Sequence, residues 1–165
     1  MSLLPGEERG TQMTYEEVVD QINQIRRFGN LAGVEVAGRM LKALGSPQAG
    51  IPLIHIAGTN GKGSVSAFLC AILREAGLRV GMFTSPHLVD FRERIQINGE
   101  MISKEDTQRI GVQLLAMDFG VQPTMFDVTL AMAILYFKEQ RCDVMILETC
   151  LLYTSPSPRD RQKSR

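Results

Sequence analysis

The chain of 165 residues contains no tryptophan, only three cysteines and no surplus of charge of either sign. Its 18 Lys and Arg residues balance 18 Asp and Glu residues, so it lacks the basic excess with which nucleic-acid-binding proteins neutralise phosphates. Cys70, Cys142 and Cys150 are too few and too scattered for a disulfide framework or a zinc cluster. We therefore expect a globular protein of a reducing compartment, the cytoplasm, that binds no nucleic acid.

Long apolar runs are absent as well. No stretch approaches the roughly 18–20 apolar residues that are needed to cross a bilayer. The first residues, MSLLPGEERGTQM, lack the basic segment and apolar core that mark a secretory signal. With 44% hydrophobic residues the sequence can nevertheless bury a core. We therefore expect a soluble, folded protein without a membrane partner.

The last sixteen residues differ in character from the rest. They read CLLYTSPSPRDRQKSR, in which four residues are basic, one is acidic, and the Ser-Pro-Ser-Pro run forbids a helix. One interpretation is a polar tail without fixed structure. The sharper interpretation is that residues 150–160, CLLYTSPSPRD, translate the transposon adapter of shotgun sequencing libraries. We then expect the tail to be non-native and the natural sequence to be interrupted near Thr149.

Before that tail, segments with helical periodicity alternate with short apolar runs. Thr14 and Glu17 have the spacing of a capping box, which indicates a helix start, and Asn98-Gly99 indicates a hairpin between residues 93 and 102. We expect further strands over 52–57, 79–84 and 143–148, and helices over 14–27, 34–44, 103–117 and 127–139, with another helix that follows residue 64 and ends near 77. Strands that alternate with helices and are apolar on both faces predict an α/β fold with a parallel sheet. The 143–148 strand is expected at an open edge of that sheet.

A glycine-rich loop, GTNGKGS at Gly58–Ser64, follows the first apolar strand and precedes a helix. Glycines let backbone N–H groups turn toward an anion, the helix N-terminus adds positive charge, and Lys62 can reach terminal phosphates. A strict Walker A motif has four residues between its first Gly and the Gly-Lys pair, whereas this loop has two, and Gly63 separates Lys62 from Ser64. The alternative is a glycine-rich turn with an exposed lysine. The flanking strand and helix favour a phosphate site.

Glu148 ends the apolar strand DVMILE. In open α/β sheets ligands lie outside the carboxyl ends of the strands, and P-loop proteins hold Mg²⁺ with a carboxylate placed in this way. Ser85 follows another strand at the same expected edge and could add a hydroxyl to the metal. Glu148 could equally be an ordinary strand-end acid, and the residues alone favour a ligand role less for Ser85 than for Glu148.

Four segments together resemble bacterial folylpolyglutamate synthases, which are often bifunctional with dihydrofolate synthase and belong to the Mur ligase superfamily. The segments read HIAGTNGKGSVSAFL, FTSPHLVDFRERIQING, MFDVTLAMAILYF and DVMILE. The phosphate loop marks the superfamily, whereas TSPHL followed by ERI marks the folate branch. The resemblance covers residues 14–149. It implies a truncated, Mur-ligase-like ATP-binding domain over 51–149, preceded by an N-terminal helical segment over 1–50.

The resemblance also implies roles for single residues. It implies that the loop binds the phosphates of ATP and that Lys62 is the catalytic cation at the transferred phosphoryl group. The implied ATP-binding residues are Gly58, Thr59, Asn60, Gly61, Lys62, Gly63 and Ser64. The implied ligands of Mg²⁺ are Ser85 and Glu148.

Two further segments are implied to contact the pterin-bearing substrate. One is a closing loop from Pro86 to Arg94, in which His87 is better explained as a loop residue than as a ligand. The other is a motif of an aromatic followed by an acid, which lines the pteroate pocket. The implied substrate-binding residues are Pro86, His87, Arg94, Thr124, Met125, Phe126 and Asp127. Gly29 to Ala32 correspond by spacing to an N-terminal substrate loop, and Cys70 and Cys142 are expected in the core.

The implied reaction is ATP-dependent amide formation. Transfer of the γ-phosphoryl group converts a folate carboxylate into an acyl phosphate, which the α-amino group of L-glutamate attacks. Such a transfer needs positioning and charge neutralisation, for which Lys62, the loop amides and Mg²⁺ suffice. The implied partners are small molecules, namely folate and L-glutamate, and the parent is expected to be a monomer.

The sequence departs from the family after Thr149. Family members continue with a Gly-Leu-Gly-Gly-Arg-Leu-Asp-type segment, an adenine pocket and a C-terminal glutamate-binding domain. We therefore expect an inactive fragment that binds ATP weakly and is poorly soluble or partly molten. Two other functions stay open: a Mur-type ligase that acts on another carboxylate, and a non-catalytic nucleotide-binding module.

Overall fold

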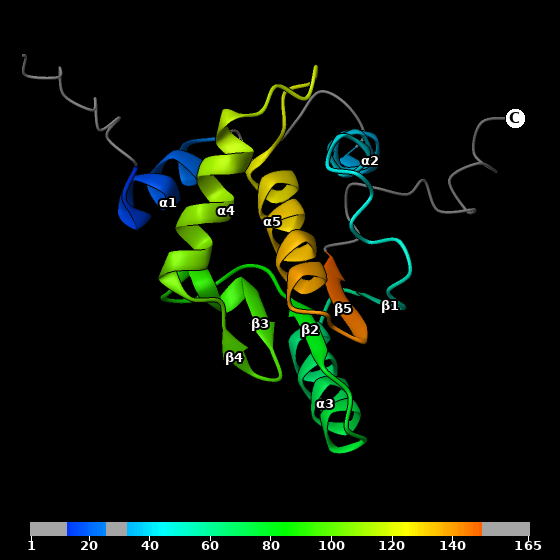
Figure 1. Ribbon diagram of the computed structural model, residues 1–165. Coiled ribbons are helices and arrows are strands. Elements are labelled where there is room, and N and C mark those ends of the chain that lie inside the picture. Colours follow the sequence, from blue (N-terminus) through cyan, green and yellow to red (C-terminus); the bar gives the residue numbers. More distant parts are fainter. Residues whose placement is uncertain (1–12, 26–32, 150–165) are drawn as a thin grey trace, which may run out of the picture.

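The computed structural model describes residues 13–25 and 33–149 (Figure 1). Its elements are α1 (Tyr15–Gln24), α2 (Gly33–Ala43), β1 (Leu53–Ala57), α3 (Lys62–Glu75), β2 (Val80–Phe83), a 3₁₀ helix η1 (Phe91–Arg94), β3 (Ile95–Ile97), β4 (Glu100–Met101), α4 (Lys104–Ala116), α5 (Met125–Glu139) and β5 (Val144–Thr149). The helices, the strands and the hairpin that the sequence predicts are all present. The expected substrate loop at 29–32 and the segment from residue 150 onward lie outside the described residues.

Side-chain caps fix where the helices begin, because the first N–H groups of a helix have no partner within it. At the start of α1, Glu17 N donates to Thr14 Oγ1 at 3.2 Å and Thr14 N donates to Glu17 Oε2 at 2.7 Å, so the predicted capping box is confirmed. Ser103 caps α4 by accepting a hydrogen bond from Asp106 N at 3.0 Å.

The strands form one sheet in the order β1-β5-β2-β3-β4. β5 pairs in parallel with β1 on one side and with β2 on the other, whereas β3 and β4 are added as an antiparallel hairpin. The sheet is therefore mixed, with a parallel part where the site residues were predicted. The expectation that the 143–148 strand lies at the edge is wrong, because β1 is the edge strand and β5 is central.

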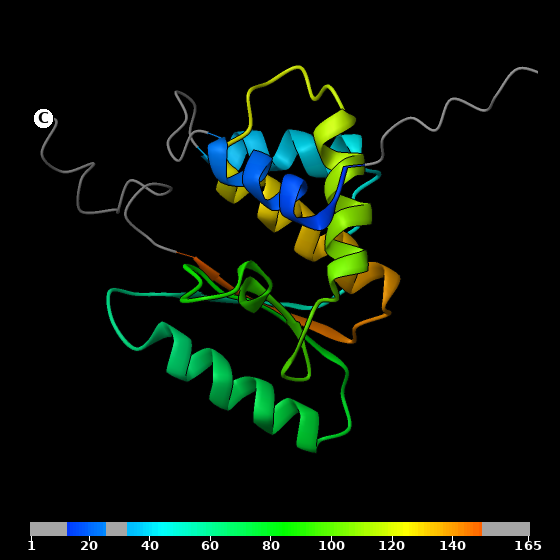
Figure 2. The same ribbon diagram turned by 90° about the vertical axis from the view of Figure 1, so that its left-hand side faces the viewer.

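The two crossover helices explain this order. α3 joins β1 to β2 across one face of the sheet, and α5 precedes β5 on the other face (Figure 2). Right-handed crossovers on opposite faces move the chain in opposite directions along a sheet. α5 therefore returns the chain into the gap between β1 and β2.

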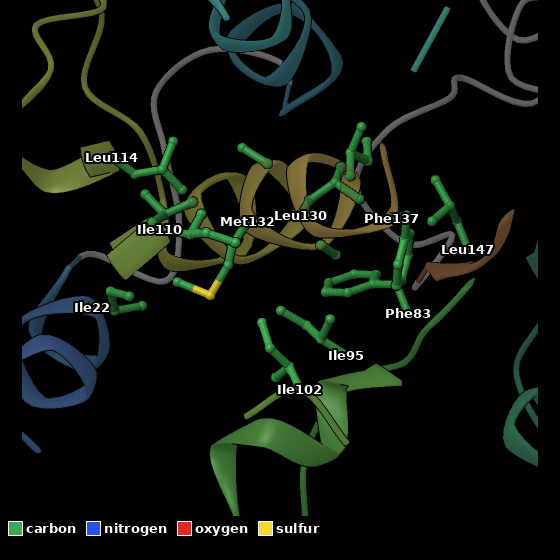
Figure 3. Packing of buried hydrophobic residues seen from close by; sticks show 14 of the residues in the cluster. Ile22, Phe83, Ile95, Ile102, Ile110, Leu114, Leu130, Met132, Phe137 and Leu147 are labelled. Atoms are coloured by element: carbon green, nitrogen blue, oxygen red, sulfur yellow. The ribbon is translucent and has the colours of Figure 1, made fainter. Parts of the chain in front are cut away.

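Helices cover the two faces of the sheet unequally. α3 lies alone on one face, whereas α1, α2, α4 and α5 lie together on the other (Figure 2). The larger core lies between these four helices and the sheet, around the buried side chains of α5 (Figure 3), and it includes Val18 and Ile22 of α1 and Val36 and Met40 of α2. A smaller core under α3 contains Cys70, Val80, Met82, Val144 and Ile146.

Both described cysteines, Cys70 and Cys142, are buried as expected. Among residues 13–25 and 33–149, no helix has the length and apolar character needed to cross a bilayer.

Gly81 in β2 marks the closest approach of α5 to the sheet. A Cβ atom at this position would lie 2.6 Å from Cγ of Phe137. We expect Gly81→Ala to lower the free energy of unfolding by about 1–3 kcal/mol, because the strand and the helix must move apart. Urea denaturation measures this change.

Gly38→Ala on α2 is the matched control for this substitution. No atom lies within 4 Å of the Cβ position of Gly38, and alanine is the better helix former, so stability should hold or rise. Equal stability of the Gly81 and Gly38 variants would contradict the packing of α5 on β2.

Candidate active site

The carboxyl ends of three parallel strands bring the predicted site segments to one edge of the sheet. β1 ends at Ala57, directly before the glycine-rich loop, and β2 ends at Phe83, directly before Thr84 and Ser85. Glu148 is the next-to-last residue of β5. Since β1, β5 and β2 are parallel neighbours, these ends lie side by side. The three segments therefore meet where the sequence analysis expects them.

The glycine-rich loop leads into the first turn of α3. Gly61 precedes the helix with φ 76°, a left-handed conformation that glycine adopts at little cost, and the helix begins at Lys62. None of the described side chains caps this helix, so its first N–H groups and its positive dipole end can face an anion. Lys62 Nζ donates to Gly58 O at 2.9 Å, which folds the lysine back over the loop. Thr59, Asn60, Gly63 and Ser64 are exposed on the same loop and turn.

Glu148 lies beside this helix start. A Cβ atom added to Gly63 would be 3.9 Å from Glu148 Oε2, so the carboxylate is close to the first turn of α3. Its side chain is 6% exposed, and no described residue donates a hydrogen bond to it. Burial raises the pKa of Glu148, and the positive charge of Lys62 opposes that rise. Buried carboxylates are normally hydrogen-bonded or bound to a metal ion, so Glu148 is suited to bind a further cation.

The residues at this edge fit a magnesium–nucleotide complex better than a metal held by protein alone. The described part of the chain contains no group of three or more His, Cys, Asp or Glu side chains that could surround a metal ion. Mg²⁺ usually takes one or two protein carboxylates and completes its shell with water and phosphate oxygens. Glu148 can supply that carboxylate, and the half-buried Ser85 lies on the neighbouring strand end.

Glu93 organises the loop between β2 and β3. Its carboxylate accepts hydrogen bonds from three successive backbone N–H groups, those of Leu88 at 2.8 Å, Val89 at 2.9 Å and Asp90 at 2.7 Å. These hydrogen bonds, led by that from Asp90, lower the pKa of Glu93. The sequence analysis missed this role, although the spacing of Asp90 and Glu93 is that of the capping box that opens η1.

Arg94 and His87 fix the other part of the loop. Arg94 is 5% exposed, and its Nε donates to Nδ1 of His87 at 2.8 Å. Burial and the charge of Arg94 lower the pKa of His87, so its ring is neutral at neutral pH. This hydrogen bond joins the two side chains within the loop, and a substrate role for His87 and Arg94 stays a prediction. At the loop tip, Leu88 and Val89 are 90% and 91% exposed.

The predicted pteroate motif opens α5. Thr124 N and Thr124 Oγ1 donate to Asp127 Oδ2 at 2.8 and 2.6 Å, and Asp127 N donates to Thr124 Oγ1 at 3.2 Å. Asp127 is 1% exposed, so these contacts make it a helix cap. Phe126 packs edge-to-face on Phe83 of β2 with ring centroids 5.6 Å apart, and Met125 is half-buried. A substrate role for these residues stays a prediction.

His55 on β1 makes a contact that the sequence analysis missed. Its Nε2 contacts Oγ1 of Thr149, which links the middle of β1 to the last residue of the neighbouring strand β5. A single histidine in an apolar strand gave no signal for this contact.

The raised pKa of Glu148 has a consequence for stability. A raised pKa means that the ionised carboxyl is less favourable in the folded than in the unfolded chain, so stability declines as pH rises above the usual value. Without ligand at pH 7, we expect Glu148→Gln to raise the Tm, and the difference should vanish once the pH falls below the usual pKa of a glutamate.

Thermal unfolding followed by circular dichroism at several pH values measures this effect. Glu100→Gln, at an exposed position on β4, is the control and should leave the Tm unchanged. A Glu148 variant less stable than the parent at pH 7 would show that the carboxylate has a stabilising structural role.

Known proteins of similar sequence and similar fold match most of this chain. No family model matches the chain. Over 145 residues it is 40% identical to the dihydrofolate synthase/folylpolyglutamate synthase of Bacillus subtilis, a match that covers 83% of this chain and 34% of the relative. The crystal structure of folylpolyglutamate synthase from Thermotoga maritima superposes with a TM-score of 0.72 at 40% identity, covering 81% of this chain and 32% of that protein.

A solved FPGS–AMPPCP–folate complex superposes with a TM-score of 0.71 at 34% identity, covering 82% of this chain and 35% of the other. The chain thus spans about a third of the length of these proteins. The sequence match and the structural matches each cover about four fifths of this chain. The chain belongs to the folylpolyglutamate synthase/dihydrofolate synthase family.

Proposed function

We propose that this chain carries the ATP-binding and folate-binding part of a ligase that adds L-glutamate to a folate. The observation that carries the proposal is the buried carboxylate of Glu148, which accepts no hydrogen bond from a described residue and lies beside the uncapped start of α3 and the charge of Lys62. The similarity to a folylpolyglutamate synthase solved with AMPPCP and folate supports the choice of ligands. The related Bacillus subtilis enzyme is named for dihydrofolate synthesis as well, so dihydropteroate is a second acceptor in the proposal.

The chemistry begins with the phosphates of ATP at the loop. The N–H groups of the first turn of α3 donate to phosphate oxygens, and Lys62 exchanges its hydrogen bond with Gly58 O for one with the transferred phosphoryl group. Thr59, Asn60 and Ser64 line the same anion site. The carboxylate of the folate attacks the γ-phosphorus, ADP leaves, and the acyl phosphate then loses phosphate when the α-amino group of glutamate attacks its carbonyl carbon.

Mg²⁺ neutralises phosphate charge in such transfers and would be held here by Glu148 and Ser85. No protein nucleophile is required, because the substrate carboxylate itself attacks. The chain's own contribution is to align this carboxylate with the phosphate and to supply positive charge.

The folate is assigned to the loop between β2 and β3 and to the start of α5. Pro86 and the two exposed tip residues, Leu88 and Val89, offer an apolar surface for a flat ring, on a loop that His87 and Arg94 hold in shape. Thr124–Asp127 would support the pocket wall. Scarce cysteine favours a cytoplasmic protein, and we propose that the parent ligase is a monomer there.

A second candidate function is non-catalytic nucleotide binding. It is favoured by the length of the match, because the aligned residues make up about a third of each relative. The two functions differ in whether ligation follows nucleotide binding.

Lys62→Ala tests the nucleotide binding that both functions require. We expect the affinity of the 165-residue chain for AMPPCP, measured calorimetrically with Mg²⁺, to fall roughly 10- to 100-fold, since hydrogen bonds to charged groups contribute about 1.5–3 kcal/mol. Lys138→Ala at the end of α5 is the control and should bind normally. Unchanged AMPPCP affinity in the Lys62 variant would contradict a phosphate site at this loop.

Ligation itself is tested in a chimera, in which residues 1–149 are joined to the part of the Bacillus subtilis enzyme that follows its aligned region. We expect ATP- and glutamate-dependent elongation of tetrahydrofolate, and at least a 100-fold loss in the Lys62→Ala chimera. AMPPCP binding without elongation in a folded chimera would favour the non-catalytic function.

A further inference from the structure

The first residue of α1 contacts the tip of the loop between β2 and β3. The hydroxyl of Tyr15 donates to Asp90 Oδ1 at 3.3 Å, a contact between residues 75 positions apart in the sequence. Asp90 directly follows the two tip residues, Leu88 and Val89, whose side chains are 90% and 91% exposed. A side chain of the N-terminal helix is therefore joined to the part of the loop that is assigned to the folate.

Arg92 keeps Asp90 charged. Arg92 Nε donates to both carboxylate oxygens at 3.1 Å, and Arg92 Nη2 donates to Oδ2 at 2.6 Å. These hydrogen bonds hold the pKa of Asp90 at about 2, and burial raises the pKa of Tyr15. At neutral pH the phenol is therefore the donor and the carboxylate the acceptor. A hydrogen bond to a charged acceptor is stronger than one between neutral groups.

Tyr15 is itself held in place by the helices. The capping box fixes the first turn of α1, and Lys104 Nζ of α4 lies 4.8 Å from the centre of the Tyr15 ring. Further along the same two helices, Gly111 of α4 leaves no room for a Cβ atom beside Val18 of α1, so they pack closely. Tyr15 therefore offers the loop a fixed point in the helical layer formed by α1, α2, α4 and α5 (Figure 2).

The same layer carries the other segment that is assigned to the folate. α5 packs on both α1 and α4, and Thr124–Asp127 at its start form the proposed pocket wall. The ring of Phe126 packs on Phe83, the last residue of β2, after which the loop begins. The loop is thus attached to the helical layer at its base through Phe126 and near its tip through Tyr15.

We propose that Tyr15 is a positioning residue, which acts through Asp90 to hold the tip of the loop in a fixed place relative to the start of α5. The inference rests on the proposed function, because it gives Tyr15 a role in that function's folate site. A ligand that touches both segments binds more tightly when their separation is already set, since it does not have to order the loop itself. Loss of the hydroxyl should therefore weaken folate binding and leave ATP binding and the chemical step unchanged.

Tyr15→Phe in the chimera described above tests this role. We expect KM for tetrahydrofolate to rise about 3- to 10-fold, the loss expected from one hydrogen bond, with kcat and AMPPCP affinity within about twofold of the parent. Tyr136→Phe is the matched control, because Tyr136 is also half-buried and lies near Arg79, at the opposite end of β2 from the loop. It should leave KM unchanged. A fall in kcat with unchanged KM in the Tyr15 variant would overturn the proposal.

Asp90→Ser shows whether Tyr15 acts through Asp90. Serine can still cap η1, but it is shorter and uncharged, so it loses the contacts with Tyr15 and Arg92. In the Asp90→Ser background, Tyr15→Phe should raise KM by less than about 1.5-fold, because residues that act through one network are not additive. An undiminished effect of Tyr15→Phe in that background would overturn the proposal.

The positioning role and the proposed function can fail separately. If the chimera does not elongate tetrahydrofolate, its affinity for tetrahydrofolate, measured calorimetrically with Mg²⁺ and AMPPCP, replaces KM, and Tyr15→Phe should lower that affinity by the same factor. A parent chimera that binds no tetrahydrofolate would overturn both the folate site and the role of Tyr15. A parent that binds it, with unchanged affinity in the Tyr15 variant, would overturn the role of Tyr15 alone.

Discussion

The placement of β5 between β1 and β2 is the constraint on which the candidate site depends. Because β5 has a parallel neighbour on each side, Glu148 lies between the glycine-rich loop that follows β1 and the segment with Ser85 that follows β2. At a sheet edge the same carboxylate would have only one such neighbour and more solvent. The position follows from the handedness of two crossovers, one through α3 and one through α5, that lie on opposite faces of the sheet.

The site also combines two features that a protein selected for stability alone would avoid. The start of α3 has no side-chain cap, and the nearby Glu148 is buried without a hydrogen-bond donor among the described residues. Elsewhere the chain caps its helices carefully, at Thr14, Ser103 and Thr124. The uncapped, positive end of α3 can bind a phosphate, and the carboxylate of Glu148, which has no hydrogen-bond donor among the described residues, can bind a cation. One ligand, a metal-bound nucleotide, would satisfy both groups.

Local features could be predicted from the sequence because their causes are local. The capping box of Thr14 and Glu17 and the Asn98-Gly99 turn need only neighbouring residues, and both are present in the structure. Strand order depends on how the helices pack across the whole sheet, which no local pattern encodes. The sequence analysis therefore places this strand at the edge, whereas the structure places it at the centre. The role of Glu93 is only partly local: the capping-box spacing of Asp90 and Glu93 predicts one of its three hydrogen bonds, whereas those from Leu88 N and Val89 N depend on how the loop folds back.

The hydrogen bonds of Glu93 have a further consequence for binding. Three successive amides are held by one carboxylate, so the backbone of the loop tip is already ordered before a ligand arrives. Ordering a residue costs about 1–2 kcal/mol of backbone entropy, and a ligand that meets Leu88 and Val89 would not have to supply it. The exposed tip is thus preorganised, and contact with its two apolar side chains can appear in the affinity almost undiminished.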